Sequence, residues 1–150
     1  MGPADLASVR LWDDRWMCCV WAGNVRVKRR LTLERYLSLG HLVYSMGGPD
    51  QPVALPDRHL AGRGYERRIE LSVESFLLAP FLLAGTELVT LVPARAVPFL
   101  RRTGDIRVLP APVALPVLVE MLWWHPRTNA DAGLAWLRGR IAAIAGAVAA

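Results

Sequence analysis

Short, largely apolar runs, each bounded by polar residues, glycine or proline, recur along the whole chain. Runs of about four to eight such residues are typical of buried β-strands. They occur at residues 16–21, 41–45, 88–92, 106–109 and 117–124. A further segment, residues 67–73, alternates polar and apolar side chains, which is the period of a strand.

Segments that suit helices lie between these strands. They are predicted at residues 33–38, 55–64, 76–84, 94–102 and 130–148. In the last segment, apolar residues recur on one face at helical spacing. They are Leu134, Leu137, Ile141, Ile144 and Val148. Because strands alternate with helices, the chain is predicted to be an α/β protein with a mixed, largely parallel sheet.

Residues 73–93 are predicted to join a strand, an apolar helix and a second strand. Ser75 is a good N-cap, because its hydroxyl can accept a hydrogen bond from a backbone N–H of the first helical turn. Gly85 follows the helix, where a residue with positive φ is favoured. Pro80 has no N–H to donate, so either the helix bends there or its regular part begins near Pro80. The almost wholly apolar composition predicts a buried helix.

Composition places the chain among globular proteins of one domain. It has 150 residues, of which 53% are hydrophobic, and this argues against disorder. No apolar run reaches the roughly 20 residues of a membrane span. Residues 1–10 lack the pattern of a signal peptide and are expected to be a loose leader. Cys18 and Cys19 are adjacent, which suits packing on opposite faces of a strand better than a disulfide and fits a reducing cytoplasm.

The net charge of +5 comes almost entirely from arginine, since Lys28 is the only lysine. One interpretation is a solvated surface that is rich in arginine. The other is nucleic-acid binding by the cluster of Arg26, Lys28, Arg29 and Arg30, which alone gives only salt-sensitive attraction to phosphates. No helix-turn-helix or zinc-finger pattern accompanies the cluster, so the chain alone is not expected to bind DNA specifically.

Side chains that could support catalysis or hold a metal are scattered along the sequence. His41, His59 and His125 lie far apart and lack the spacing of metal ligands. The Ser, His and Asp residues form no ordered constellation such as the G-x-S-x-G nucleophile elbow. The sequence therefore predicts no enzyme, no metal site and no cofactor.

An ordered set of blocks resembles the effector-binding domains of LysR-type transcriptional regulators. The blocks are L-T-L-E-R-Y, H-L-V-Y-S-M-G-G, L-A-G-R-G-Y-E-R-R-I-E-L-S-V-E-S-F, A-G-T-E-L-V-T-L-V-P, I-R-V-L-P-A-P, M-L-W-W-H-P-R and a closing A-W-L-R. Together they cover roughly residues 11–140. The W-H-P-R arrangement is similar to the branch of the family that includes nodulation-gene and aromatic-catabolism regulators.

The resemblance implies a fold like that of type 2 periplasmic binding proteins, in which two lobes enclose a cleft. Lobe II would occupy about residues 31–110, and about residues 113–150 would return to the remainder of lobe I. The second lobe would be incomplete, and the helix-turn-helix part of the family has no counterpart in the sequence. We therefore expect a truncated regulator or a stand-alone remnant of one.

In the family, effectors bind in the cleft between the lobes, and a loop after a strand and the start of a helix contribute to it. The matching residues here are Tyr44, Ser45, Met46, Gly47, Ser75 and Phe76, with Trp123 as a further candidate. The hydroxyls of Ser45 and Ser75 and the ring face of Phe76 suit a small ligand. Alternatively, Ser75 only caps its helix and Phe76 belongs to the core. Glu74 would also repel an anionic effector.

The leading hypothesis is the effector-sensing part of a LysR-type regulator, which binds a small aromatic or carboxylated molecule between its lobes. The expected partners are this small-molecule effector and further copies of the chain in a homo-oligomer, with no membrane, in the cytoplasm. One alternative is a stand-alone solute-binding domain, which should carry a secretion signal that is not seen here. Another is a non-functional remnant of a regulator.

Overall fold

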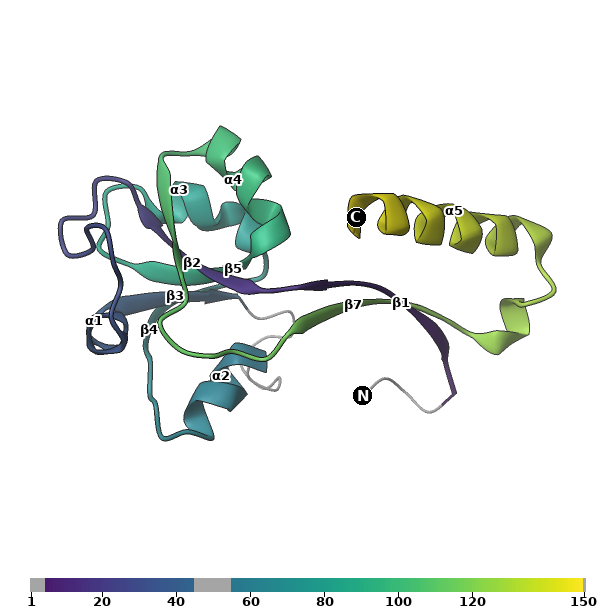
Figure 1. Cartoon of the computed structure of the whole chain (residues 1–150), viewed down its shortest axis with the longest axis horizontal. Helices are drawn as coiled ribbons and strands as arrows, with labels where there is room; N and C mark the ends of the chain where they lie inside the picture. Colours follow the sequence, from purple (N-terminus) through teal and green to yellow (C-terminus); the bar gives the residue numbers. More distant parts are fainter. Residues whose placement is uncertain (1–4, 45–54, 150) are drawn as a thin grey trace. The chain divides into compact units, whose positions relative to one another are not determined.

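Five strands form a mixed β-sheet in the part of the chain between Arg15 and Pro116 (Figure 1). A computed structural model describes residues 5–44 and 55–149. The strands are β2 (Trp16–Trp21), β3 (Gly40–Tyr44), β4 (Arg68–Val73), β5 (Val89–Pro93) and β6 (Ile106–Pro110). Their order across the sheet is β4-β3-β5-β2-β6. β3 is parallel to β4 and β5, whereas β2 is antiparallel to β5 and β6. Only β2 runs against the other four, which confirms the predicted α/β class with a mixed, largely parallel sheet.

Short helices cover the two faces of this sheet (Figure 1). α3 (Ala79–Leu83) and α4 (Val97–Thr103) lie on one face, and α2 (Leu55–Ala61) lies on the other. α4 follows the 3-10 turn η2 (Ala94–Ala96). The core under α3 and α4 is a cluster of fully buried residues from both helices and three strands. Its members are Cys19, Leu42, Ala79, Leu83, Val92 and Leu100.

The first helix, α1 (Leu33–Ser38), begins where the sequence predicts it. The Thr32 hydroxyl accepts a hydrogen bond from the Arg35 N–H at 3.2 Å and so caps the helix. Tyr36 is the buried residue of α1, and its backbone carbonyl accepts from the His41 ring at 2.9 Å. These bonds fix the turn between α1 and β3.

In the segment after β4, Ser75, Pro80 and Gly85 have the roles predicted for them. Ser75 caps the 3-10 turn η1 (Phe76–Leu78), because its hydroxyl accepts from the Leu77 N–H at 3.2 Å. Pro80 lies in the first turn of α3, so the regular helix begins there rather than bending, and Gly85 has φ 73°.

The prediction that the whole segment is buried was wrong. Phe81 is 61% exposed, and Leu77 and Leu78 are also exposed. Only one side of η1 and α3 packs on the sheet, through residues such as Ala79 and Leu83.

The other described residues, 5–14 and 117–149, form a second compact unit, which we call the ribbon unit; residues 15–116 are the sheet unit. In the ribbon unit, β1 (Ala7–Asp14) pairs antiparallel with β7 (Leu118–Trp124), from Ala7 opposite Trp124 to Asp14 opposite Leu118. The expectation of a loose leader over residues 1–10 was therefore wrong for the part that forms β1.

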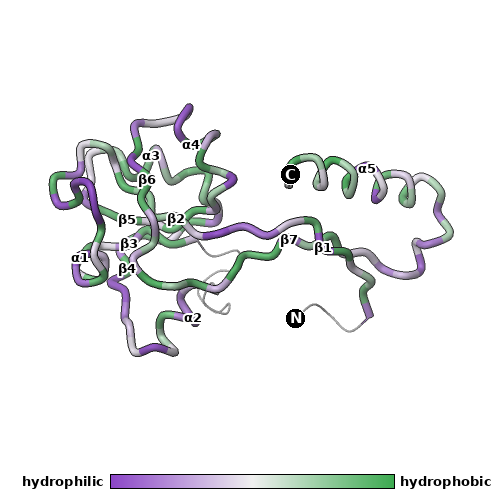
Figure 2. Tube along the Cα trace, in the orientation of Figure 1, coloured by the Kyte–Doolittle hydropathy of each residue, from purple (hydrophilic) through white to green (hydrophobic). Residues whose placement is uncertain are grey.

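The ribbon unit ends with the 3-10 turn η3 (Pro126–Thr128) and the helix α5 (Ala132–Ala149). The Asp131 carboxylate accepts from the Leu134 N–H at 2.9 Å and caps α5. The C-terminal half of α5 is largely hydrophobic (Figure 2). However, its predicted apolar stripe is mostly exposed, for example 57% at both Ile144 and Val148. No helix in the described residues is long and apolar enough to cross a membrane.

The predicted lobe boundaries, about residues 31–110 and 113–150, stay a prediction. β2 lies within the sheet unit, between β5 and β6. Its Cys18 is opposite Leu91 on one side and Leu109 on the other. The residues that precede Leu31 therefore contribute an internal strand to the same sheet.

Candidate functional site

Three aromatic side chains meet in the sheet unit, and we call them the aromatic cluster: Trp16, Tyr44 and Phe76. The rings of Tyr44 and Phe76 contact edge to face, with centroids 5.7 Å apart, and the rings of Tyr44 and Trp16 are 6.2 Å apart. Tyr44 is the last residue of β3, Trp16 is the first of β2, and Phe76 begins η1. The structure thus brings together Tyr44 and Phe76, two of the predicted effector-site residues.

The alternative interpretation of Ser75 and Phe76 also finds support in the structure. The Ser75 hydroxyl is engaged in capping η1. Phe76 is half-buried and packs against the core cluster under α3 and α4. Its ring therefore has one side on the core and another side on Tyr44. Phe76 has a structural role in either case, and a ligand would use only the remaining part of its surface.

The other candidate residues have different outcomes. Ser45, Met46 and Gly47 lie outside the described residues. Trp123 lies in β7 of the ribbon unit, where its side chain is 40% exposed. Their assignment to an effector site stays a prediction.

A buried ion pair, which the sequence did not predict, lies beside Tyr44. The guanidinium of Arg67 pairs with the carboxylate of Asp57, and the two side chains are only 5% and 11% exposed. Arg67 also donates to the Tyr36 hydroxyl at 3.2 Å, while its Nε has no hydrogen-bond partner among the described residues. A small pocket opens next to this pair. It is lined by Leu42, Val43, Tyr44, Pro56, Asp57, Arg67, Thr90 and Leu91.

Burial around this ion pair changes the pKa values of its neighbours. Desolvation raises the pKa of Tyr36 to about 12, although Arg67 opposes the shift. Desolvation, together with the charge of Arg67, lowers the pKa of His41 to about 4. Both side chains are therefore neutral near pH 7, and Arg67 with Asp57 supplies the charge in this part of the sheet unit.

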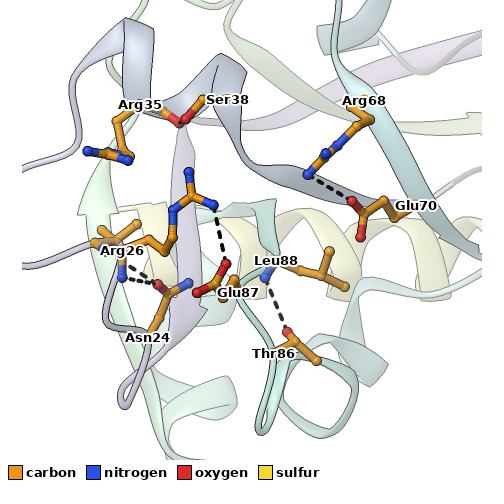
Figure 3. A network of polar contacts seen from close by, with 10 residues as sticks. Asn24, Arg26, Arg35, Ser38, Arg68, Glu70, Thr86, Glu87 and Leu88 are labelled. Atoms are coloured by element: carbon orange, nitrogen blue, oxygen red, sulfur yellow. Dashed lines mark hydrogen bonds and ion pairs between the residues drawn. The ribbon is translucent and has the colours of Figure 1, made fainter.

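Arg26, one member of the basic cluster of residues 26–30, belongs to a network of polar surface contacts near the start of β4 and β5 (Figure 3). Arg26 pairs with Glu87 at 3.3 Å, and Arg68 pairs with Glu70 at 2.9 Å. The Asn24 carboxamide accepts from the Arg26 N–H at 2.9 Å and so fixes the loop. Because Arg26 already faces a carboxylate, this arrangement favours the interpretation of the cluster as a solvated surface.

The side chain of Arg107 holds the same loop from the sheet. It donates to the backbone carbonyls of Ala22, Val27 and Lys28. Three carbonyl groups thus surround one guanidinium, which gives Arg107 a structural role. The exposed charges that remain in the cluster, Lys28 among them, are on the loop rather than on a recognition helix.

The three histidines have the separate, ordinary roles expected from the sequence. His41 is buried and bonds to the carbonyl of Tyr36, and the ring of His59 lies 3.1 Å from the Ala114 carbonyl oxygen. His125 caps η3 by accepting from the Arg127 N–H at 3.1 Å. Within residues 5–44 and 55–149, no group of three or more His, Cys, Asp or Glu residues could hold a metal ion.

Comparison with known sequences gives a match over nearly the whole chain. Residues 2–145 match a family described as the LysR substrate binding domain. Nodulation protein D 3 of Mesorhizobium japonicum is 30% identical over 128 residues, which cover 85% of this chain and 42% of that protein. The chain spans about two fifths of the length of the curated relatives that it matches.

Solved structures agree with this match. A probable transcriptional regulator from Pseudomonas aeruginosa aligns with 94% of this chain and 45% of its own, with a TM-score of 0.82 and 26% identity. The regulatory domain of MexT, a transcriptional activator in the same organism, aligns with 93% of this chain and 68% of its own, with a TM-score of 0.77 and 25% identity. Both alignments include most of the sheet and ribbon units.

Proposed function

Because the chain belongs to the LysR substrate-binding domain family, we propose that it is the effector-sensing part of a LysR-type bacterial transcriptional regulator. A small molecule would bind one conformation of the domain more tightly than another and so shift their populations. In a homo-oligomer, such a shift would change the arrangement of the subunits. The match over residues 2–145 carries this part of the proposal.

The effector would bind against the aromatic cluster of the sheet unit. The edge-to-face contact of Tyr44 with Phe76 is the observation that supports this position. Two half-buried rings at the end of a strand suit a planar aromatic ligand, because aromatic pairs gain from offset or edge-to-face contacts. A carboxylate on the ligand has less support, since the adjacent Glu74 would repel it.

Isothermal titration calorimetry of the chain with uncharged hydroxylated aromatic compounds, each beside its cyclohexane counterpart, would test this position. We expect the aromatic compounds to bind more tightly. Phe76→Leu should weaken binding by about two- to tenfold, the range of one aromatic pair. Phe81→Leu is the matched control, because Phe81 is 61% exposed on α3, and His59→Ala is a second one. Equal losses in the three variants would contradict the position, provided that circular dichroism shows that they are folded.

The two cysteines argue against a sensor that works through thiol oxidation. Cys18 and Cys19 are free and buried in β2. Desolvation raises the pKa of each thiol to about 12, so both are protonated near pH 7. Reactive cysteines need an accessible thiolate. The effector is therefore proposed to be a bound molecule rather than an oxidant, and buried free thiols fit the proposed reducing cytoplasm.

A further inference from the structure

The neighbouring strands β3 and β5 part towards the end of β3. Among the described residues, the two strands share only one residue pair, His41 with Val89. On its other side, β3 is paired with β4 along its whole length, and β5 is paired with β2 in the same way. The parting is therefore confined to one line inside the sheet, where Val43 and Leu91 follow the last pair.

The small pocket beside the ion pair of Arg67 and Asp57 lies at this parting. Its volume is about 10 Å³, and its lining includes Val43 and Leu91, both of which are buried. The lining residues that the structure describes all belong to the sheet unit. A cavity of this volume has room for about one water molecule and is too small for an organic ligand.

One hydrogen-bond donor at this cavity has no acceptor. The Nε of Arg67 makes no hydrogen bond to any described residue, although the side chain is only 5% exposed. The other two nitrogens of the guanidinium are engaged, because Nη2 pairs with Asp57 and Nη1 donates to the Tyr36 hydroxyl at 3.2 Å. A buried donor without a partner destabilises the fold, so an acceptor beside Nε would stabilise it.

Charge and geometry favour a neutral acceptor that can also donate. The carboxylate of Asp57 balances the charge of Arg67, and Tyr36 and His41 are neutral near pH 7, so these groups have no net charge to attract an anion. The Nη2 and Nε atoms of a guanidinium donate on the same side. A molecule that accepts from Nε therefore lies next to the Asp57 carboxylate, to which it can donate.

We propose that this cavity binds one internal water molecule, which accepts from Arg67 Nε and donates to the carboxylate of Asp57. Its second hydrogen is directed to a backbone carbonyl at the parting of β3 and β5. Internal water molecules typically make about three hydrogen bonds to buried polar groups and are costly to remove. The water molecule joins α2, through Asp57, to two central strands of the sheet unit.

Val43→Ile tests this site, because it adds one methyl group to a side chain that lines the cavity. The methyl group displaces the water molecule and leaves Nε of Arg67 without an acceptor, so the equilibrium constant for folding should fall about tenfold. In Arg67→Met, which has no such donor, the same change should alter this constant by less than about threefold. Val20→Ile is the matched control, because Val20 is fully buried in β2 and lies outside the described lining.

Urea unfolding of these variants in both backgrounds would measure the folding constants. Val20→Ile should have the same effect in the parent and in Arg67→Met. An equal loss from Val43→Ile in the two backgrounds would indicate overpacking and would overturn the proposal. A gain in stability from Val43→Ile in the parent would also overturn it, because that is the expected result of filling a dry cavity.

Nuclear magnetic resonance gives a measurement that does not depend on stability. The Arg67 Nε–H signal should show a rotating-frame Overhauser cross-peak to water in the parent chain, and Val43→Ile should remove this cross-peak. A parent chain without the cross-peak would overturn the proposal. So would its loss on addition of sodium chloride, since an anion would then be the preferred ligand of the cavity.

Discussion

The buried pair of Arg67 and Asp57 should be one of the most sensitive points of the sheet unit. Asp57 lies in the first turn of α2, and Arg67 immediately precedes β4, so the pair joins this helix to the sheet. Asp57→Ala leaves a guanidinium that is only 5% exposed with the Tyr36 hydroxyl as its remaining partner. Removing one member of a buried ion pair typically costs about 3–5 kcal/mol, because the other charge stays in a medium of low polarity.

Substitution of Arg67 should lower the free energy of unfolding by less than substitution of Asp57. Arg67→Met keeps an apolar side chain of similar length and leaves Asp57, which is 11% exposed, at a helix N-terminus that favours a negative charge. We expect a loss of about 2 kcal/mol for this variant. The double variant should be more stable than the sum of the two losses predicts, by at least about 1 kcal/mol, since no buried charge is left without a partner.

Urea unfolding followed by circular dichroism would give these free energies, and hydrogen exchange would localise the effect. Because α2 is only seven residues long, it depends on its contacts with the sheet. Exchange of the Gly62 and Arg63 amides, which close the end of α2, should therefore accelerate in Asp57→Ala. A loss below about 1 kcal/mol for Asp57→Ala, or strictly additive losses in the double variant, would refute the argument from uncompensated charge.

Two further predictions follow from the buried histidine and the basic surface. The pKa of His41 is lowered to about 4 in the folded chain, against about 6.5 in the unfolded chain. The unfolded chain therefore binds the proton first, and the free energy of unfolding falls by about 3 kcal/mol as the pH drops from about 6.5 through 4. Urea titrations at pH values from 7 to 4 should show this fall in the free energy of unfolding, and His41→Gln should reduce it. The same fall in His41→Gln would exclude His41 as its cause. The chain alone should show no sequence preference in a gel-shift assay at about 150 mM salt, because its exposed basic residues give only phosphate attraction. Selective binding of one promoter would contradict this expectation.

Local chemistry made part of the fold predictable from the sequence. Thr32, Ser75 and Gly85 each act within a few residues of their own position, and each does what its side chain or backbone permits. Pro80 left two possibilities open, and the structure selects the start of α3. Features that depend only on neighbouring residues in the chain were therefore predicted correctly from the sequence.

Features that depend on residues distant in the chain could not be predicted from the sequence. Residues 7–10 of β1 were expected to belong to a loose leader, and their partner strand β7 lies more than about 100 residues further on. The pair of Arg67 and Asp57 has no mark in the sequence that distinguishes it from surface charges. Phe81 was predicted to be buried from the apolar composition around it, although only one side of η1 and α3 reaches the sheet.

The position of β2, antiparallel between β5 and β6, has a consequence for the synthesis of the protein. Both of its partners, β5 and β6, lie about 70–90 residues later in the chain, and so they leave the ribosome long after β2 does. At roughly 5–20 residues per second, this interval is about 4–18 s. During that time, Trp16–Trp21 is an apolar strand whose two edges have no native partner. An unpaired apolar strand is open to aggregation over this interval, and slowing of translation between β2 and β6 would lengthen that exposure.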